Sequence, residues 1–213
     1  TYQEANERTK YWIVVVGADG REGADREHLC MDEDDREALE QAIVEAKAVN
    51  GKVILVINAT GPIELNDFSE RVNAILCPFL TGIQGGKIIA DAIFGLFNPS
   101  GKLPLTWPKH DYDCPSYKNF GGENKEVWYS EGIYVGYRWY DSRHIDPFYP
   151  FGFGLSYTNF EIEDAFVPTE INVDKESITV NVTIKNIGKY AGSEVIQTYV
   201  HEVNSKFDRP EKE

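Results

Sequence analysis

A short polar stretch, residues 18–31, concentrates the side chains best suited to proton transfer. It holds Glu22, Asp25 and Glu27, with Arg21 and Arg26 beside them. The stretch follows an apolar run that predicts a strand, and open parallel sheets present ligand-contacting residues just beyond such strand ends. By position alone, an ion pair of Glu22 with Arg21 or Arg26 explains Glu22 better than catalysis does, because most loop carboxylates are solvated. Asp25 and Arg26 are expected to pair and shape the loop.

Other chemistries find less support in the residues. A glycine-rich stretch that resembles a nucleotide-binding loop follows the first predicted strand, with Gly17, Gly20 and Gly23. In the dinucleotide fingerprint, however, a helix begins directly after the glycines, whereas here the next predicted helix begins only at about Asp32. The four histidines have no partners at metal-ligand spacing, and the three cysteines are too scattered for a zinc site or a disulfide framework. No Gly-x-Ser-x-Gly elbow occurs. We therefore expect neither a cofactor nor a metal.

The elements that must position the polar stretch alternate in type. Residues 12–16 and 53–57 are β-rich apolar runs that predict strands buried on both faces, and residues 74–80 predict a third strand. Between the first two, Asp32 can cap a helix with an acidic first turn, and Gly51 ends it. Its apolar face is formed by Leu39, Ala42, Ile43, Ala46 and Val49. Residues 84–94 predict a further helix, so the alternation indicates a parallel α/β layer.

The amino-acid composition changes after residue 98. Residues 98–158 are rich in Pro, Gly and aromatics, and we expect them to wrap the α/β layer with their aromatic side chains mostly in the core, among them Trp128, Tyr134, Tyr137, Trp139 and Tyr140. From residue 160 the pattern is all-β, with strict alternation over residues 178–184 and another strand over residues 195–200. We predict two domains, residues 1–158 and 159–213, the second too short to close a sandwich of about seven strands.

Composition narrows the function classes. The 213 residues carry a net charge of −14, and an acidic chain without a basic block disfavours nucleic-acid binding. No apolar run approaches the ~20 residues of a membrane helix, so a membrane partner is not expected. The start of the chain lacks an initiator Met and a signal pattern, so we expect an interior piece of a longer protein.

Several segments together carry a specific likeness. They are residues 22–26 (EGADR), 98–108 (NPSGKLPLTWP), 131–141 (EGIYVGYRWYD) and 150–158 (PFGFGLSYT). In this order they resemble the C-terminal part of the family 3 glycoside hydrolases, and most of all the β-glucosidases. Residues 186–188 and 191–200 resemble the start of that family's fibronectin-III-like domain. The resemblance implies part of a mostly parallel α/β sandwich, followed by a truncated all-β fibronectin-III-like sandwich.

The resemblance also implies a chemistry. In such enzymes a TIM-type barrel carries the nucleophilic Asp, and the α/β sandwich contributes a loop with the acid/base carboxylate. Glu22 matches that acid/base residue, so the resemblance implies a retaining exo-acting β-glucosidase whose barrel is missing from this chain. Its substrate would be a β-glucoside or oligosaccharide, and the chain alone is expected to be inactive. The alternatives are a β-xylosidase or other family 3 exo-glycosidase, and a noncatalytic structural or glycan-binding fragment.

One departure from the family pattern concerns specificity. Many β-glucosidases carry an aromatic residue two positions after the acid/base Glu, where this chain has Ala24, so its aglycone preference is open. The position of the acid/base also shifts among subfamilies, which keeps Asp25 and Glu27 as alternatives.

Two sequons bear on the compartment. Asn58 and Asn181 each begin an Asn-x-Thr sequence, a possible glycosylation site. Asn181 faces away from the apolar side of its predicted strand, whereas Asn58 closes a buried strand, which disfavours its modification. The sequons favour a secreted or periplasmic protein, and the cysteine count leaves the cytoplasm open.

Overall fold

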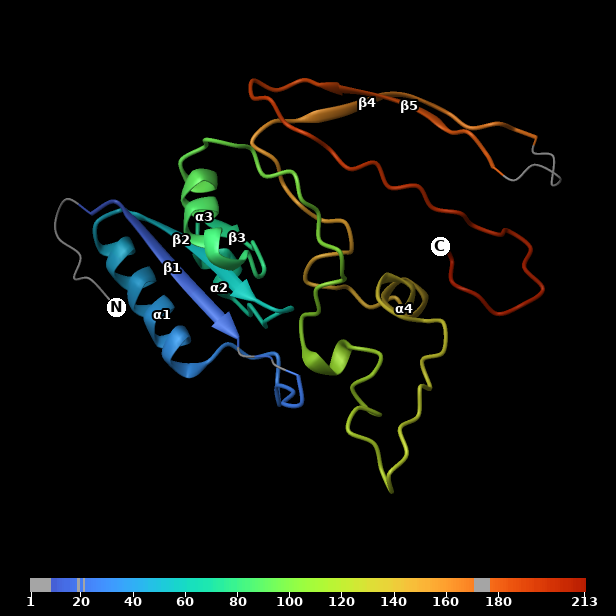
Figure 1. The fold of residues 1–213 in the computed structure, drawn as a ribbon, viewed down its shortest axis with the longest axis horizontal. Coiled ribbons are helices and arrows are strands. Elements are labelled where there is room, and N and C mark those ends of the chain that lie inside the picture. Colours follow the sequence, from blue (N-terminus) through green and yellow to red (C-terminus); the bar gives the residue numbers. More distant parts are fainter. Residues whose placement is uncertain (1–8, 19, 21, 171–176) are drawn as a thin grey trace.

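The α/β layer is built from three parallel strands and the helix between the first two (Figure 1). The computed structural model describes residues 9–18, 20, 22–170 and 177–213, so Arg21 lies outside the described residues. Strands β1 (Tyr11–Ala18), β2 (Lys52–Ala59) and β3 (Ala74–Leu76) lie in the order β1-β2-β3, with Trp12 opposite Val53. The parallel layer predicted from the alternating pattern is confirmed, although the third strand ends at Leu76 rather than at residue 80.

Helix α1 (Glu33–Ala48) covers one face of β1 and β2. Four of its residues, Leu39, Ala42, Ile43 and Ala46, are buried against the core that also contains Trp12, Val16 and Leu55. The prediction that Val49 belongs to this apolar face is wrong, because Val49 lies beyond the last helical residue and is exposed. Asp32 occupies the N-cap position but makes no side-chain capping bond.

Strand β1 is buried on only one face. Trp12 and Val16 point into the core, whereas Ile13 and Val15 are 49% and 53% exposed. The expectation of a strand covered on both faces is therefore wrong for β1, since no described helix covers its second face. Strand β2 does meet the expectation, because Val53, Leu55, Val56 and Ile57 are all buried.

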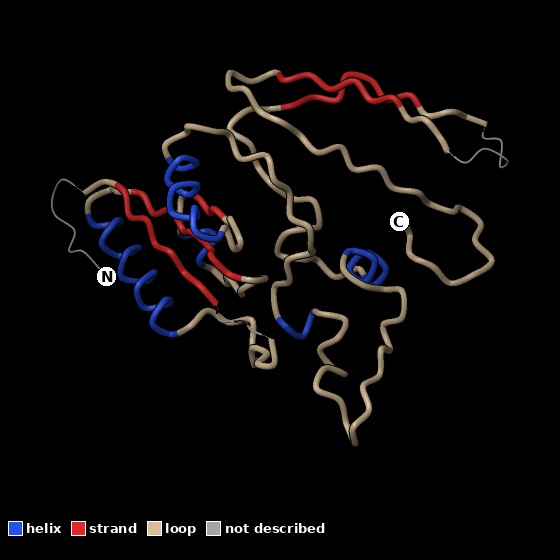
Figure 2. Tube along the Cα trace, in the orientation of Figure 1, coloured by secondary structure: helices blue, strands red, loops and turns tan. Residues whose placement is uncertain are grey.

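Residues 98–158 attach to this layer through the residues around Trp107 and Tyr149. They follow α2 (Phe68–Arg71), η1 (Gly82–Gln84) and α3 (Gly85–Ile93), and contain only η2 (Asp111–Asp113) and α4 (Tyr137–Arg143) as helices (Figure 2). Trp107 is buried, donates from its indole nitrogen to the carbonyl oxygen of Ile63 at 2.9 Å, and forms a β-bridge with Tyr149. The segment is anchored to the layer at Trp107, but the expectation that its aromatic side chains lie mostly in the core is wrong for Trp128, which is 70% exposed.

The C-terminal part is a two-stranded antiparallel sheet followed by an extended segment. Strands β4 (Phe160–Phe166) and β5 (Asn181–Asn186) pair with each other. In the face predicted to be buried, Ile178 and Ile184 are 52% and 38% exposed, so the expectation of burial is wrong for these two residues. The strand predicted over residues 195–200 is also wrong. Its backbone forms no ladder with described residues, and only Val200 bonds to Glu213. No helix among the described residues has the length and apolar character to cross a membrane.

Candidate active-site loop at the carboxyl edge of the sheet

The loop that carries Glu22 begins where β1 ends and is held at three points. The Arg26 guanidinium donates to the carbonyl oxygen of Pro62 at 2.7 Å, and the Glu64 amide donates to the carbonyl oxygen of Leu29 at 2.7 Å. His28 lies 3.5 Å from the Asp111 carboxylate, measured from Nδ1 to Oδ2. These contacts fix the second half of the loop to the segment after β2 and to η2.

The strand end itself is tied to α1. The Gly17 amide donates to the Asp35 carboxylate at 2.8 Å, so the end of β1 is fixed to the first turn of the helix. A Cβ atom on Gly20 would lie 2.8 Å from the hydroxyl of Thr60, which shows how closely the loop passes the residues after β2.

Glu22 itself is exposed at the open side of this loop. Its carboxylate makes no hydrogen bond or ion pair with any residue that the structure describes, and the same holds for Asp25 and Glu27. The predicted pair of Asp25 with Arg26 is wrong, because the guanidinium turns inward to Pro62 instead. The proposed pair of Glu22 with Arg21 lies outside the described residues. Three exposed carboxylates, none of them bonded to a described residue, thus lie on one anchored loop.

Arg26 lies partly inside the protein. Burial lowers the pKa of its guanidinium, and the charge of Asp32 acts in the opposite direction. Its second terminal nitrogen, Nη1, is buried and has no hydrogen-bond partner among the described residues. An arginine stays charged in proteins, so this residue brings a fixed positive charge beneath the loop of Glu22.

Glu64 organises the neighbouring segment. Its Oε1 accepts from the Asp111 amide at 3.0 Å, and its Oε2 lies 3.7 Å from Nδ1 of His110. Partial burial, and then the charges of Glu64 and Asp111, raise the pKa of the Cys30 thiol. The sequence offered no signal for Glu64, because its partners lie far along the chain. In the described part of the chain, no group of three or more His, Cys, Asp or Glu side chains is placed to hold a metal ion.

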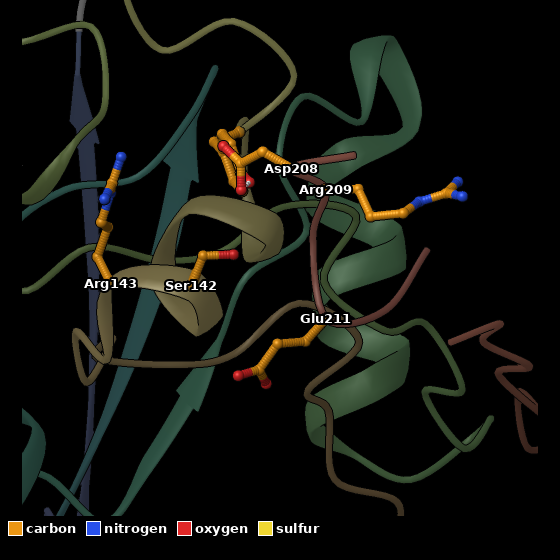
Figure 3. A pocket seen from close by; sticks show the side chains of 6 residues that line it. Ser142, Arg143, Asp208, Arg209 and Glu211 are labelled. Atoms are coloured by element: carbon orange, nitrogen blue, oxygen red, sulfur yellow. Dashed lines mark hydrogen bonds between the residues drawn. The ribbon is translucent and has the colours of Figure 1, made fainter. Parts of the chain in front are cut away.

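A polar hollow of about 190 Å³ lies elsewhere, between α4 and the C-terminal segment (Figure 3). The Tyr134 hydroxyl donates to Asp208 at 2.6 Å, and this bond raises the pKa of Tyr134. Arg143 stacks over Tyr134, while Arg209 pairs with acidic residues of its own segment. The two arginine side chains point away from each other in Figure 3, so they form no clamp for an anion. This hollow is a structural junction.

The sequons lie on exposed positions. Asn58 and Asn181 both have exposed side chains, Asn58 near the end of β2 and Asn181 at the start of β5. The buried strand around Asn58 therefore does not bury that side chain.

Comparisons with known proteins agree in pointing to one family. The sequence model described as "Glycosyl hydrolase family 3 C-terminal domain" matches residues 2–137. Thermostable beta-glucosidase B of Acetivibrio thermocellus is 43% identical over 90% of this chain, and a beta-glucosidase of Rhizobium radiobacter is 39% identical over 99%. The matches span 25% and 26% of those relatives, so the chain covers about a quarter of their length.

Solved structures show the same relationship. Beta-glucosidase 3B of Thermotoga neapolitana in complex with alpha-D-glucose matches 97% of this chain and 29% of its own, with a TM-score of 0.89 and 36% identity. A beta-glucosidase of Kluyveromyces marxianus in complex with glucose matches 97% of this chain and 24% of its own, with a TM-score of 0.85 and 37% identity.

Proposed function

Since the chain belongs to glycosyl hydrolase family 3 through that family's C-terminal domain, we propose that it supplies the proton-handling loop of a retaining exo-acting β-glucosidase. Glu22 is the acid/base residue in this proposal. The observation that carries it is the placement of Glu22, exposed and unpaired by any described residue, on an anchored loop at the carboxyl edge of β1. A TIM-type barrel outside this chain supplies the nucleophilic carboxylate.

The mechanism divides the work between two carboxyl groups about 5–5.5 Å apart. Protonated Glu22 donates its proton to the glycosidic oxygen while the barrel's carboxylate attacks the anomeric carbon, which releases the aglycone and leaves a glycosyl-enzyme. Glu22, now ionised, then takes a proton from the water that hydrolyses that intermediate. The barrel must cover Glu22, because burial near a second negative charge is what keeps a carboxyl protonated at neutral pH. We therefore expect no hydrolysis by the 213-residue chain alone.

The substrate in this proposal is a terminal β-D-glucosyl residue. It rests on the names of the relatives, which are β-glucosidases, and on the glucose in the solved complexes of the Thermotoga neapolitana and Kluyveromyces marxianus enzymes. The barrel would choose the sugar, so a β-xylosidase or another exo-glycosidase of the family would use the same loop.

The test is Glu22→Gln in the intact enzyme that contains this chain. Turnover of cellobiose, whose leaving group needs a proton, should fall by about 10²–10⁴-fold. Cleavage of p-nitrophenyl glucoside should be limited by the second step, and azide should restore it because azide attacks without a base. Asp25→Asn and Glu27→Gln are matched controls on the same loop and should remain active. Unchanged cellobiose turnover in Glu22→Gln, or the same loss in a control instead, refutes the assignment of Glu22.

A further inference from the structure

The residues that follow β2 form a fixed support for the loop of Glu22. Ile63 and Leu65 are 0% and 1% exposed, and the Ile63 carbonyl oxygen accepts a hydrogen bond from the indole of the buried Trp107. The backbone of Glu64, between these two core residues, is therefore held on both sides. The Glu64 side chain is only 11% exposed, and a carboxylate at such a depth destabilises a fold unless it is bonded. Its partners therefore indicate its role.

Glu64 belongs to a closed ring of contacts that joins three segments. Its backbone amide donates to the carbonyl oxygen of Leu29 in the loop, at 2.7 Å. Its carboxylate oxygen Oε1 accepts from the backbone amide of Asp111 in η2, at 3.0 Å. The Asp111 carboxylate lies 3.5 Å from Nδ1 of His28, which precedes Leu29 in the chain and so closes the ring. We call these four residues the anchor ring.

The anchor ring holds the same half of the loop that Arg26 holds. Arg26 donates to the carbonyl oxygen of Pro62, two residues before Glu64, so the loop runs alongside residues 62–64 here. Glu22 lies four residues before Arg26, and its side chain is not bonded to any residue in the described ranges. The direction of the Glu22 carboxyl therefore depends on the backbone of the loop, and through it on these anchors.

Within the described part of the chain, no lysine or arginine pairs with the carboxylates of the anchor ring. Their charged partners are histidines, with Nδ1 of His110 3.7 Å from Oε2 of Glu64. The shortest contact of the Glu64 side chain is thus the bond from the Asp111 amide, which would lose its partner without it. An apolar side chain at position 64 would suit the core at least as well, but it could not hold η2. Joining η2 to the loop is what requires a carboxylate here.

We propose that Glu64 is a positioning residue for Glu22, which acts through the anchor ring. The inference rests on the proposed role of Glu22 as the acid/base. The Glu64 carboxylate fixes η2, the Asp111 carboxylate fixes His28, and the loop backbone then holds the Glu22 carboxyl where its proton reaches the glycosidic oxygen. A shift of about 1 Å in such a group can cost up to about 10²-fold in rate. The loss should fall on the step that needs the proton.

The test uses the intact enzyme that contains this chain and two substrates that differ in their leaving group. The quantity measured is kcat/KM, which reports cleavage of the glycosidic bond. Glu64→Ala should lower kcat/KM for cellobiose at least about tenfold, because its leaving group needs a proton. It should lower kcat/KM for 2,4-dinitrophenyl glucoside no more than about threefold, because dinitrophenolate leaves without one. Glu64→Gln, whose amide oxygen can still accept from Asp111, should restore most of the rate with cellobiose.

A double variant tests whether Glu64 acts through Glu22. Glu22→Gln removes the acid, so adding Glu64→Ala to it should lower kcat/KM for cellobiose by no more than about a further twofold. Full additivity of the two losses would show that Glu64 acts independently of Glu22 and would overturn the proposal. Equal losses for both substrates in Glu64→Ala, or no loss for either, would overturn it as well.

A matched control and a second variant complete the experiment. Glu70→Ala removes an exposed carboxylate of α2 and should leave both kcat/KM values unchanged. Circular dichroism checks folding, and if Glu64→Ala does not fold, His28→Ala decides, because it removes a ring member that is 66% exposed. A loss confined to cellobiose in His28→Ala supports the ring, whereas no loss, or equal losses for both substrates, overturns it.

The two proposals fail in different ways. If Glu22→Gln leaves cellobiose turnover unchanged, the catalytic assignment of Glu22 fails, and the role of Glu64 fails with it. If Glu22→Gln loses cellobiose turnover and Glu64→Ala does not share this selective loss, only the role of Glu64 is overturned.

Discussion

The Arg26 guanidinium and the Pro62 carbonyl oxygen, 2.7 Å apart, join the loop of Glu22 to the segment that follows β2. This bond replaces the local pair with Asp25 that the sequence suggested. A charged donor to a partly buried carbonyl is among the stronger hydrogen bonds in proteins. We therefore propose that Arg26 is a positioning residue, which acts on Glu22 through the loop.

We expect Arg26→Ala in the intact enzyme to misplace Glu22. A displacement of about 1 Å can cost up to about 10²-fold in rate, so kcat for cellobiose should fall by at least about tenfold with little change in KM. Steady-state kinetics measure this split, and the alkaline limb of the pH–rate profile, which reports the loss of the proton from Glu22, should move because the surroundings of Glu22 change. Arg36→Ala, which removes an exposed arginine of α1, should alter neither quantity. If Arg26→Ala changed stability alone, Arg26 would have no positioning role.

Trp107 should be the most sensitive residue of the wrapping segment. Trp107→Phe removes the indole donor and leaves the buried Ile63 carbonyl without its partner, and it also opens a void in the core. We expect the free energy of unfolding to fall by about 2–4 kcal/mol, measured by urea denaturation. Trp128→Phe, at a residue 70% exposed, should change it by no more than about 0.5 kcal/mol. Equal effects of the two substitutions would contradict the assignment of Trp107 as the anchor.

The sequence predicted those elements whose determinants are local. The apolar runs of β1 and β2 and the helical spacing of Leu39, Ala42 and Ala46 specify strand, helix and strand without reference to the rest of the chain. Placing Glu22 just beyond β1 followed directly from this order.

Contacts between distant residues could not be predicted in the same way. Arg26 and Pro62 are 36 positions apart, and an adjacent carboxylate made Asp25 look like the natural partner. Periodicity also cannot tell whether a partner covers an apolar face. The alternation around Ile184 predicted a strand correctly but its burial wrongly, because burial depends on what packs there.

The three cysteines should differ in reactivity in the order of their exposure. Cys30 is exposed, whereas Cys77 and Cys114 are half-buried. Burial is the largest effect on all three and raises each thiol pKa. Alkylation by iodoacetamide, followed by mass spectrometry, should modify Cys30 first. The rate of Cys30 alkylation should still increase as the pH is raised above about 8.5, the ordinary pKa of a thiol. Only the thiolate reacts, and the pKa of Cys30 is raised. Glu64→Gln removes a nearby negative charge and should speed the reaction at pH 8, and equal rates for Cys30 and Cys114 would contradict this picture.

The link between α1 and α2 should depend on pH. Both terminal nitrogens of Arg71 donate to the Glu40 carboxylate, and the hydrogen bond from Arg71 lowers the pKa of Glu40. Because the folded pKa is lowered, the stabilisation is present above the unfolded value of about 4.3 and is lost as pH falls through the folded value. Glu40→Gln should therefore reduce the free energy of unfolding by no more than about 1 kcal/mol at pH 6, since the pair is largely exposed. Urea titrations at several pH values should show this difference closing toward pH 3. Glu37→Gln, on an exposed residue of the same helix, should show no such closure, and a difference for Glu40→Gln that persisted at pH 3 would mean that the lost interaction is not an ionic one.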